Sequence, residues 1–233
     1  MSKNLVIIPT YNEQDTIERL TTVLFGLSTP LDILIVDDGS DQTSAIIQRL
    51  QAEHPNLFLI KRQTKSGRGT AVLEGMRFGL AHGYEYLIEM DADFSHQPEE
   101  LPLLLAQAAP HRVVIGSRYL RGSKIVNWPV SRRIFSKLAN FYAKLILGIR
   151  IHDYTNGYRV YSRDAVMQLQ FERIKSRGYI VLSEIAYQLH RRGVEFVEVK
   201  TLFINRARGT SSFSLKEVKE AFASVLRIRR EYR

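Results

Sequence analysis

The sequence contains no cysteine, which excludes disulfide bonds and any metal site built on thiolates. It also lacks long apolar runs: the longest stretch without Asp, Glu, Lys or Arg is Leu20–Leu31, which includes Pro30. A membrane-spanning helix needs about 20 consecutive apolar residues, so we predict that the chain does not cross a membrane unaided. Met1–Asn4 leads directly into an apolar run without a small-residue cleavage motif, which predicts no signal peptide.

Several motifs that define common enzyme classes are absent. The segment Gly67-Arg68-Gly69 lacks the third glycine of the dinucleotide fingerprint, and no G-x-x-x-x-G-K-[ST] segment occurs. There is no G-x-S-x-G elbow, and the six histidines show no metal-ligand spacing. These absences argue against nicotinamide-dependent oxidoreductases, P-loop nucleotidases, serine hydrolases and histidine-based metal sites.

Acidic residues are missing from one long internal block, which runs from Leu101 to His152. The basic residues of this block are Arg112, Arg118, Arg121, Lys124, Arg132, Arg133, Lys137, Lys144 and Arg150. Over the whole chain Lys and Arg exceed Asp and Glu by 33 − 24 = +9. Such a block favours an anionic partner, either nucleic acid, an anionic membrane surface or a phosphate-bearing substrate. A basic face that is only solvated is the alternative.

Apolar strand-like runs alternate with helical segments along the first half of the chain. The predicted buried strands are Leu5–Pro9, Ile33–Val36, Leu57–Ile60, Tyr84–Met90 and Val113–Ser117. The predicted helices between them are 16–27, 43–53, 70–82 and 98–107. This alternation predicts right-handed βαβ units and a mostly parallel sheet flanked by helices, and 233 residues fit a single domain.

The second half of the chain begins with an expected linker at 121–129 and an amphipathic helix at 130–147. Further along, we predict strands at 157–162 and 195–203, a helix at 181–192 and a basic C-terminal helix from Leu215. On the helix at 130–147 an apolar stripe is edged by basic residues; the stripe is Ile134, Leu138, Phe141 and Leu145, and its edge is Arg133, Lys137 and Lys144. Such a helix lies either on an ordinary protein surface or in a membrane interface.

Polar and acidic clusters follow three of the predicted strands, at Thr10–Glu13, Asp37–Ser40 and Asp91–Asp93. In parallel sheets ligands bind beyond the carboxyl ends of the strands. Two carboxylates there can hold one hard divalent cation, which leaves coordination sites open for substrate phosphates. A solvated turn at Asp91–Asp93 and a helix cap at Asp37–Ser40 are the alternative interpretations. The convergence of the three clusters favours a site for a nucleotide diphosphate.

These motifs, in this order, resemble the inverting family 2 glycosyltransferases, and within them the polyprenol-phosphate (dolichol-phosphate) mannose synthases. The resemblance covers about Leu5–Ser214. Its segments are VIIPTYNE (6–13), VDDGS (36–40), the loop 67–69, MDADFSH (90–96), GSRY (116–119), NWPVSRRIFSKLAN (127–140), DYTNGYRVY (153–161) and NRARGTSS (205–212).

The resemblance implies a single-domain nucleotide-diphospho-sugar transferase fold of the GT-A type, with 1–110 as nucleotide-binding half, 111–214 as acceptor half and 215–233 as C-terminal helix. It implies metal-dependent transfer of a sugar, most closely mannose from GDP-mannose, to a polyprenyl phosphate with inversion. The cofactor implied is Mg²⁺ or Mn²⁺.

The resemblance also implies roles for individual residues. The implied donor-binding residues are Pro9, Tyr11, Glu13, Asp38, Asp91 and Arg206. The implied acceptor-phosphate residues are Arg118, Arg132 and Ser136. The metal would be held by Asp91 and Asp93, and the implied catalytic residues are Asp93, Asp153 and Arg118, with Asp153 beside the transferred sugar.

Four positions depart from the family pattern. Ser95 and Ser183 stand where the family usually has Gln, and Ser212 stands where it usually has Lys. Asn205 replaces the acidic residue that usually precedes Arg206. The first alternative is therefore the same chemistry with another donor, such as UDP-glucose or a UDP-amino sugar. A non-catalytic nucleic-acid or phosphate-binding protein is the second. Aromatic residues are not interleaved with the basic block as stacking platforms would require, so we expect no nucleic-acid partner.

The expected partners are therefore the nucleotide-sugar donor, the polyprenyl phosphate lipid and a membrane surface, which the helix at 130–147 would contact. A small membrane-embedded partner subunit is compatible with the lack of a spanning segment. We expect a cytoplasmic protein that lies peripherally at the cytoplasmic face of the membrane.

Overall fold

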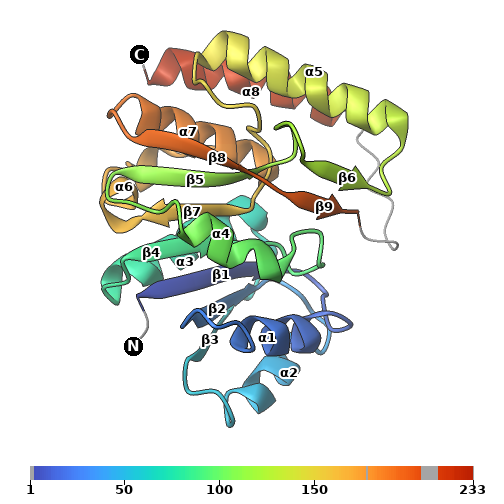
Figure 1. Ribbon diagram of the computed structural model, residues 1–233, viewed down its shortest axis with the longest axis vertical. Coiled ribbons are helices and arrows are strands. Elements are labelled where there is room, and N and C mark those ends of the chain that lie inside the picture. Colours follow the sequence, from blue (N-terminus) through green and yellow to red (C-terminus); the bar gives the residue numbers. More distant parts are fainter. Residues whose placement is uncertain (1–2, 177, 206–214, 233) are drawn as a thin grey trace.

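The computed structural model describes residues 3–176, 178–205 and 215–232, and it is built on a central seven-stranded sheet (Figure 1). The strand order is β3-β2-β1-β4-β7-β5-β8. The strands are β1 (Asn4–Thr10), β2 (Asp32–Asp37), β3 (Leu57–Lys61), β4 (Tyr86–Glu89), β5 (Arg112–Ser117), β7 (Arg159–Ser162) and β8 (Glu195–Lys200). Only β7 runs against its neighbours β4 and β5 in this sheet. The prediction of a mostly parallel sheet is confirmed.

Helices cover both faces of this sheet, as expected. The longer ones are α1 (Ile17–Phe25), α2 (Thr43–Leu50), α3 (Arg68–Ala81), α5 (Val130–Leu147), α7 (Val181–His190) and α8 (Leu215–Glu231). Shorter ones are α4 (Leu101–Leu105), α6 (Arg163–Val166) and the 3₁₀ turns η1 (Pro98–Glu100), η2 (Phe171–Arg173) and η3 (Gly178–Ile180). Successive residues of β1 alternate between two apolar clusters: Leu5 packs with α3 and α7, whereas Val6 packs with α1, α2 and α4.

A second, two-stranded sheet pairs β6 (Lys124–Val126) in parallel with β9 (Leu202–Ile204) at one end of the molecule (Figure 1). Two predictions were wrong here, because the expected linker at 121–129 contains a strand and the expected strand at 195–203 is interrupted at Thr201. The side chain of Thr201 donates to Glu100, and its backbone N–H donates to Ser123 Oγ over 3.3 Å. These bonds end the β8 ladder and turn the chain toward β6.

The helix α5 has the bounds that the sequence predicted. Pro129 precedes its first residue, and Gly148 ends it with a φ of 73°, a left-handed conformation that favours glycine. It lies beside α8 (Figure 1), and Tyr142 on α5 donates a hydrogen bond to the Phe222 carbonyl over 3.2 Å. Neither α5 nor any other helix of the described residues combines the length and apolar character that a bilayer crossing requires.

Candidate active site

Two adjacent carboxylates at the end of β2 have different surroundings. Asp37 is fully buried and accepts hydrogen bonds from Thr10 Oγ1 at 2.9 Å and Lys61 Nζ at 2.8 Å. Burial alone would raise the pKa of Asp37, but the bonds from Lys61 and Ser44 outweigh it and hold this pKa below its usual value. Asp37 therefore joins three neighbouring strands and is a structural residue.

Asp38 faces the loop before α3 instead. Its carboxylate receives two donors from the guanidinium of Arg62, as well as the backbone N–H groups of Ser66 at 3.1 Å and Gly67 at 3.2 Å. Asp38 therefore holds this loop in place at the carboxyl edge of the sheet. Its expected contact with the donor's base or ribose stays a prediction.

The other expected nucleotide-binding residues lie along the same edge. Tyr11 is 46% exposed, and Lys65 Nζ lies 3.5 Å from the centre of its ring. Pro9 and Glu13 are half-buried, at the end of β1 and in the turn that follows it. An open aromatic ring with a cation above it gives this edge a surface on which a planar base can stack.

The carboxylate pair Asp91 and Asp93 follows β4 in a tight turn. Asp91 Oδ1 accepts from Arg68 Nε at 2.8 Å, and the same guanidinium pairs with Glu89 at 2.5 Å. Burial would raise the pKa of Asp91, but the charge and hydrogen bond of Arg68, together with the charges of His96 and Arg118, outweigh burial and lower this pKa, so the carboxylate is ionised at neutral pH. The turn is held by a bond from the Ser95 N–H to Asp93 Oδ1 at 3.0 Å.

The donor set around this pair fits a hard divalent cation. Asp91 and Asp93 supply carboxylate oxygens, which Mg²⁺ and Mn²⁺ prefer. Ser95 Oγ is buried and has no hydrogen-bond partner within the described part of the chain, so an oxygen ligand is left unused beside the pair. No cluster of three or more His, Cys, Asp or Glu residues suited to a metal occurs among residues 3–176, 178–205 and 215–232.

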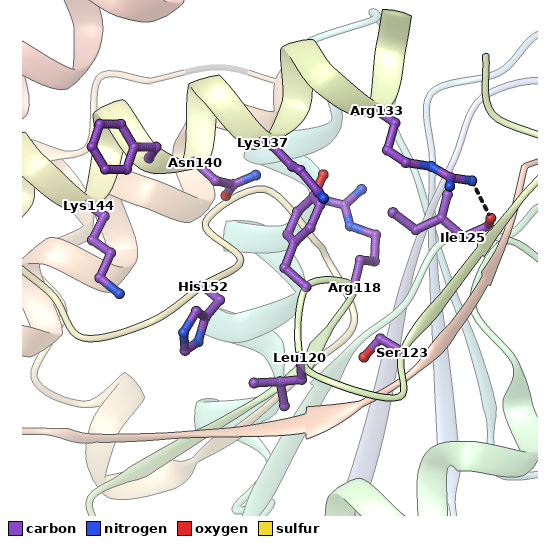
Figure 2. Close-up of a pocket in the computed structure, with 11 residues that line it drawn as sticks. Arg118, Leu120, Ser123, Ile125, Arg133, Lys137, Asn140, Lys144 and His152 are labelled. Carbon is purple, nitrogen blue, oxygen red and sulfur yellow. Dashed lines mark hydrogen bonds between the residues drawn. The ribbon is translucent and has the colours of Figure 1, made fainter. Parts of the chain in front are cut away.

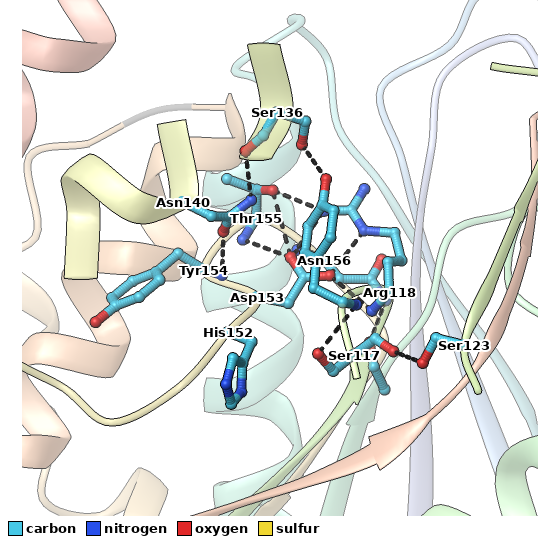
Figure 3. Close-up of polar contacts among 12 residues, drawn as sticks. Ser117, Arg118, Ser123, Ser136, Asn140, His152, Asp153, Tyr154, Thr155 and Asn156 are labelled. Atoms are coloured by element: carbon cyan, nitrogen blue, oxygen red, sulfur yellow. Dashed lines mark hydrogen bonds and ion pairs between the residues drawn. The ribbon is translucent and has the colours of Figure 1, made fainter. Parts of the chain in front are cut away.

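On the other side of the site, Arg118 and Asp153 form a buried ion pair (Figure 3). Arg118 Nε and Nη2 each lie 2.8 Å from one oxygen of Asp153, and Nη2 also donates to Thr155 Oγ1 at 2.7 Å. Burial alone would destabilise both charges. The opposite charge and the hydrogen bonds of the partner outweigh burial, so the pKa of Arg118 is raised and that of Asp153 is lowered. Asp153 thus fixes the direction of Arg118, and its expected place beside the transferred sugar stays a prediction.

Arg132 and Ser136 lie on α5 next to Arg118. The guanidinium carbons of Arg132 and Arg118 are 4.4 and 5.3 Å from the centre of the Trp128 ring. Burial and the positive charge of Arg118 together lower the pKa of Arg132, which has no ion pair among the described residues. Two guanidinium groups held this close together form a site suited to a phosphate, which accepts their forked donors. The hydroxyl of Ser136 accepts from Tyr119 at 2.6 Å.

Tyr179, in η3, connects the carboxylates to the arginines. The negative charge of Asp91, together with burial, raises the pKa of its phenol, whereas the positive charges of Arg68 and Arg118 oppose this rise. The Arg68 guanidinium lies 4.9 Å from the Tyr179 ring. Asp91 and Asp93 of the predicted metal pair and Arg118 of the predicted acceptor group therefore all act electrostatically on this phenol.

Sequence reasoning missed Arg68 and Tyr179 as members of the site. The sequence could have indicated Arg68, because this residue lies in the glycine-bearing loop at the carboxyl edge of the sheet. Its guanidinium leaves no room for a side chain at Gly157, where an added Cβ would lie 2.1 Å from Arg68 Nη2. Tyr179 had no signal in the sequence. The predicted donor residue Arg206 and the departure at Ser212 lie outside the described residues.

The mostly parallel sheet flanked by helices, with an acidic pair after β4, is a fold of the GT-A type. A family model described as Glycosyl transferase family 2 matches residues 5–170, and the chain belongs to this family. This confirms the resemblance that the motifs indicated.

Two relatives match over nearly the whole chain. An undecaprenyl-phosphate mannosyltransferase of Micrococcus luteus is 40% identical over 224 residues, which are 96% of this chain and 92% of the relative. A polyprenol monophosphomannose synthase of Mycolicibacterium smegmatis is 39% identical over 96% of this chain and 85% of the relative.

Solved structures of similar fold include glucosyl-3-phosphoglycerate synthase from Mycobacterium tuberculosis. Its complex with Mn²⁺, uridine diphosphate and glucosyl-3-phosphoglycerate gives a TM-score of 0.66 at 18% identity, covering 98% of this chain and 79% of that one. Its complex with Mn²⁺, UDP-glucose and phosphoglyceric acid gives 0.65 at 16% identity, with coverage of 98% and 79%. At this identity the likeness establishes the shared fold.

Proposed function

We propose that the chain transfers mannose from GDP-mannose to a polyprenyl phosphate and inverts the configuration at the anomeric carbon. Its membership of glycosyl transferase family 2 makes it a glycosyltransferase. The choice of acceptor and sugar is supported by two relatives of 40% and 39% identity, which are named for mannose transfer to undecaprenyl phosphate and for polyprenol monophosphomannose synthesis.

The observation that carries the proposal is the Arg118–Arg132 pair, whose charges interact electrostatically with Asp91 and Asp93. A polyprenyl phosphate is already an anionic nucleophile at neutral pH, so it needs orientation and charge compensation more than a strong general base. Two anionic substrates repel each other, and fixed guanidinium groups offset that repulsion while they align the acceptor. The bond of Asp153 to Arg118 keeps one of these groups in position.

On the donor side, Asp91 and Asp93 would hold Mg²⁺ or Mn²⁺, with Ser95 Oγ beside them. When bound, such an ion neutralises the charge that develops on the diphosphate leaving group. Tyr11, Glu13, Pro9 and Asp38 would hold the nucleotide, and Arg206 would lie near the phosphates. A phosphate oxygen of the acceptor forms a bond to the anomeric carbon while the bond from that carbon to the diphosphate breaks, and GDP leaves with the electron pair.

The chain would meet its lipid acceptor at the cytoplasmic face of the membrane, as a peripheral protein. Support comes from α5, whose apolar stripe is exposed: Ile134 by 55%, Leu138 by 58%, Phe141 by 67% and Leu145 by 70%. A row of exposed apolar side chains edged with basic ones is typical of helices that lie in a membrane interface. The described residues give no indication of a membrane-embedded partner subunit, so that expectation stays a prediction.

The test is an incubation with Mn²⁺, polyprenyl phosphate and, in separate reactions, GDP-mannose, UDP-glucose and a UDP-amino sugar. We expect a lipid-linked product from GDP-mannose alone, with β configuration in its NMR spectrum. A product from a UDP-sugar instead would support the alternative donor suggested by Ser95 and Asn205. The absence of a lipid-linked product with every donor would contradict the proposal.

A further inference from the structure

A cavity of about 420 Å³ lies against α5, beside the segment that follows β5 (Figure 2). From α5, Arg133, Lys137 and Lys144 line it, and His152 completes its basic side. Figure 2 shows Arg133 and Lys144 extending from the helix toward the chain that carries Leu120 and Ser123. Arg118 lines the cavity as well, but Arg133, Lys137 and Lys144 are cationic side chains that the proposed transfer does not use.

The positive charge of this cavity is not balanced by the residues that line it. No Asp or Glu is among the lining residues; His152 pairs with Glu198 at 2.7 Å, and Arg133 donates to the Ile125 carbonyl at 2.9 Å. Lys137 and Lys144 form no ion pair within residues 3–176, 178–205 and 215–232. Like charges around a concave surface focus a positive potential, which draws an anion into the hollow.

The cavity borders the exposed apolar stripe of α5. Phe141 lines the cavity and is also part of the stripe, where it is 67% exposed. Leu138 and Leu145, at 58% and 70% exposure, neighbour Lys137 and Lys144 in sequence. A ligand that fits both surfaces carries an anionic group joined to a hydrocarbon part, as a membrane phospholipid does. A soluble anion such as inorganic phosphate has no apolar part that could contact the stripe.

This cavity adjoins the proposed acceptor-phosphate group and shares Arg118 with it. Arg132 and Ser136 do not line the cavity, and the guanidinium of Arg118 is held by Asp153. Tyr119 lies between the two sites, because it lines the cavity and also donates to Ser136 Oγ at 2.6 Å. An anion in the cavity would thus lie next to the acceptor group without replacing the acceptor.

We propose that the cavity under the basic flank of α5 binds the phosphate of an anionic membrane phospholipid, with Lys137 and Lys144 as its principal cationic contacts. The acyl chains of this lipid would extend along the apolar stripe. The bound lipid is not a substrate; it would anchor α5 so that the acceptor arginines face the bilayer. This inference extends the proposed membrane contact, and its binding test does not depend on sugar transfer.

The experiment measures binding of dihexanoyl-phosphatidylglycerol, used as monomers below its micellar concentration, to the full chain by titration calorimetry. We expect saturable binding of one lipid per chain. A basic side chain near an anionic lipid surface strengthens binding about fivefold, so K137Q/K144Q should bind about thirtyfold more weakly. The control R121Q/K124Q removes two positive charges from the same acid-free block but from residues outside the cavity, and it should bind as the wild type does.

Three results would overturn the inference. These are a lack of saturable binding by the wild type, an equal loss in both double variants, and inorganic phosphate binding as tightly as the lipid. Dihexanoyl-phosphatidylcholine, which carries no net charge, should bind far more weakly than the anionic lipid. Transfer to a short, water-soluble prenyl phosphate should be unchanged in K137Q/K144Q. If the proposed function is wrong, the wild type itself transfers no mannose. If only the lipid site is wrong, the wild type transfers mannose but does not bind the anionic lipid.

Discussion

At the residue scale, the site is organised by arginine–carboxylate pairs that are shielded from water. Arg68 joins Asp91 to Glu89, Arg118 is held by Asp153, and Arg62 is held by Asp38. Each pair fixes a charged group at the carboxyl edge of the sheet before substrate arrives. Such preorganisation reduces the rearrangement that the protein would otherwise undergo during the reaction.

The pair of Arg118 and Asp153 gives a stability prediction. Asp153→Asn leaves a buried guanidinium without its counter-charge, which costs about 3–5 kcal/mol. We expect a fall of this size in the free energy of unfolding, measured by urea denaturation. Arg118→Met combined with Asp153→Asn should recover part of that loss, because it removes the unpaired charge. If Asp153→Asn were as stable as the wild type, the ion pair would contribute little to the free energy of unfolding.

The metal assignment also rests on single residues. Asp93→Asn replaces a carboxylate ligand by an amide and should remove the Mn²⁺-dependent part of GDP affinity, because a hard cation prefers charged oxygen ligands. Calorimetric titration of GDP with and without Mn²⁺ measures this part directly. The control is Glu53→Gln, an exposed carboxylate in the turn before the amino end of β3, which should behave as the wild type. Unchanged Mn²⁺-dependent affinity in Asp93→Asn would contradict the assignment.

At the scale of elements, α5 has three functional sides. One side carries Arg132 and Ser136 toward the site, another packs on α8 through Tyr142, and a third exposes the apolar stripe. Because 3.6 residues make one turn, the sequence predicts the apolar stripe and its basic edge, whereas the contact of Tyr142 with α8 is seen in the structure. The sequence also predicted its bounds, since Pro129 and Gly148 mark its ends.

The apolar stripe predicts membrane binding. Leu138→Gln combined with Phe141→Gln should weaken flotation with vesicles of phosphatidylglycerol by about tenfold or more, because each large apolar side chain loses about 1.5–3 kcal/mol of burial when fully inserted. Leu103→Gln combined with Met167→Gln is the matched control, since these side chains are also exposed, by 56% and 62%, but lie outside α5. Equal losses in the two variants would contradict a specific role for the stripe.

Shorter elements were harder to predict. The strand β6 has three residues and pairs with β9, which lies far along the chain, so periodicity gave no signal for it. The break at Thr201 depends on hydrogen bonds that Thr201 donates to Glu100 and Ser123, which are tertiary contacts. For the same reason Tyr179 could not be assigned, because the fold alone places its turn against Asp91. The carboxylates at the strand ends were predictable, since strand direction fixes where they meet.

At the scale of the whole molecule, three carboxylates that are paired with basic side chains couple stability to pH. The pKa values of Asp37, Asp91 and Asp153 lie below their usual value, because the bonds and charges of Lys61, Arg68 and Arg118 outweigh burial. An unfolded carboxyl has a pKa of about 3.9. The stabilisation is therefore fully present above that pH and is lost as the pH falls through the lower folded-state values.

Urea denaturation across acidic pH measures this coupling. We expect the free energy of unfolding to fall steeply below about pH 4 in the wild type. The fall should be shallower in Asp153→Asn, which has one fewer group to protonate. Identical pH dependence in the two proteins would show that Asp153 does not take up a proton when the chain unfolds.

The central claim is that Arg132 and Arg118 bind the phosphate of the acceptor, whereas the donor is bound on the side of Asp91 and Asp93. Steady-state transfer of mannose from GDP-mannose to polyprenyl phosphate tests it, with KM measured for each substrate in the wild type and in Arg132→Met. Loss of one charged hydrogen bond costs about 1.5–3 kcal/mol, so KM for polyprenyl phosphate should rise about tenfold to a hundredfold, while KM for GDP-mannose stays unchanged. An equal rise in both values, or a rise for GDP-mannose alone, would contradict the claim.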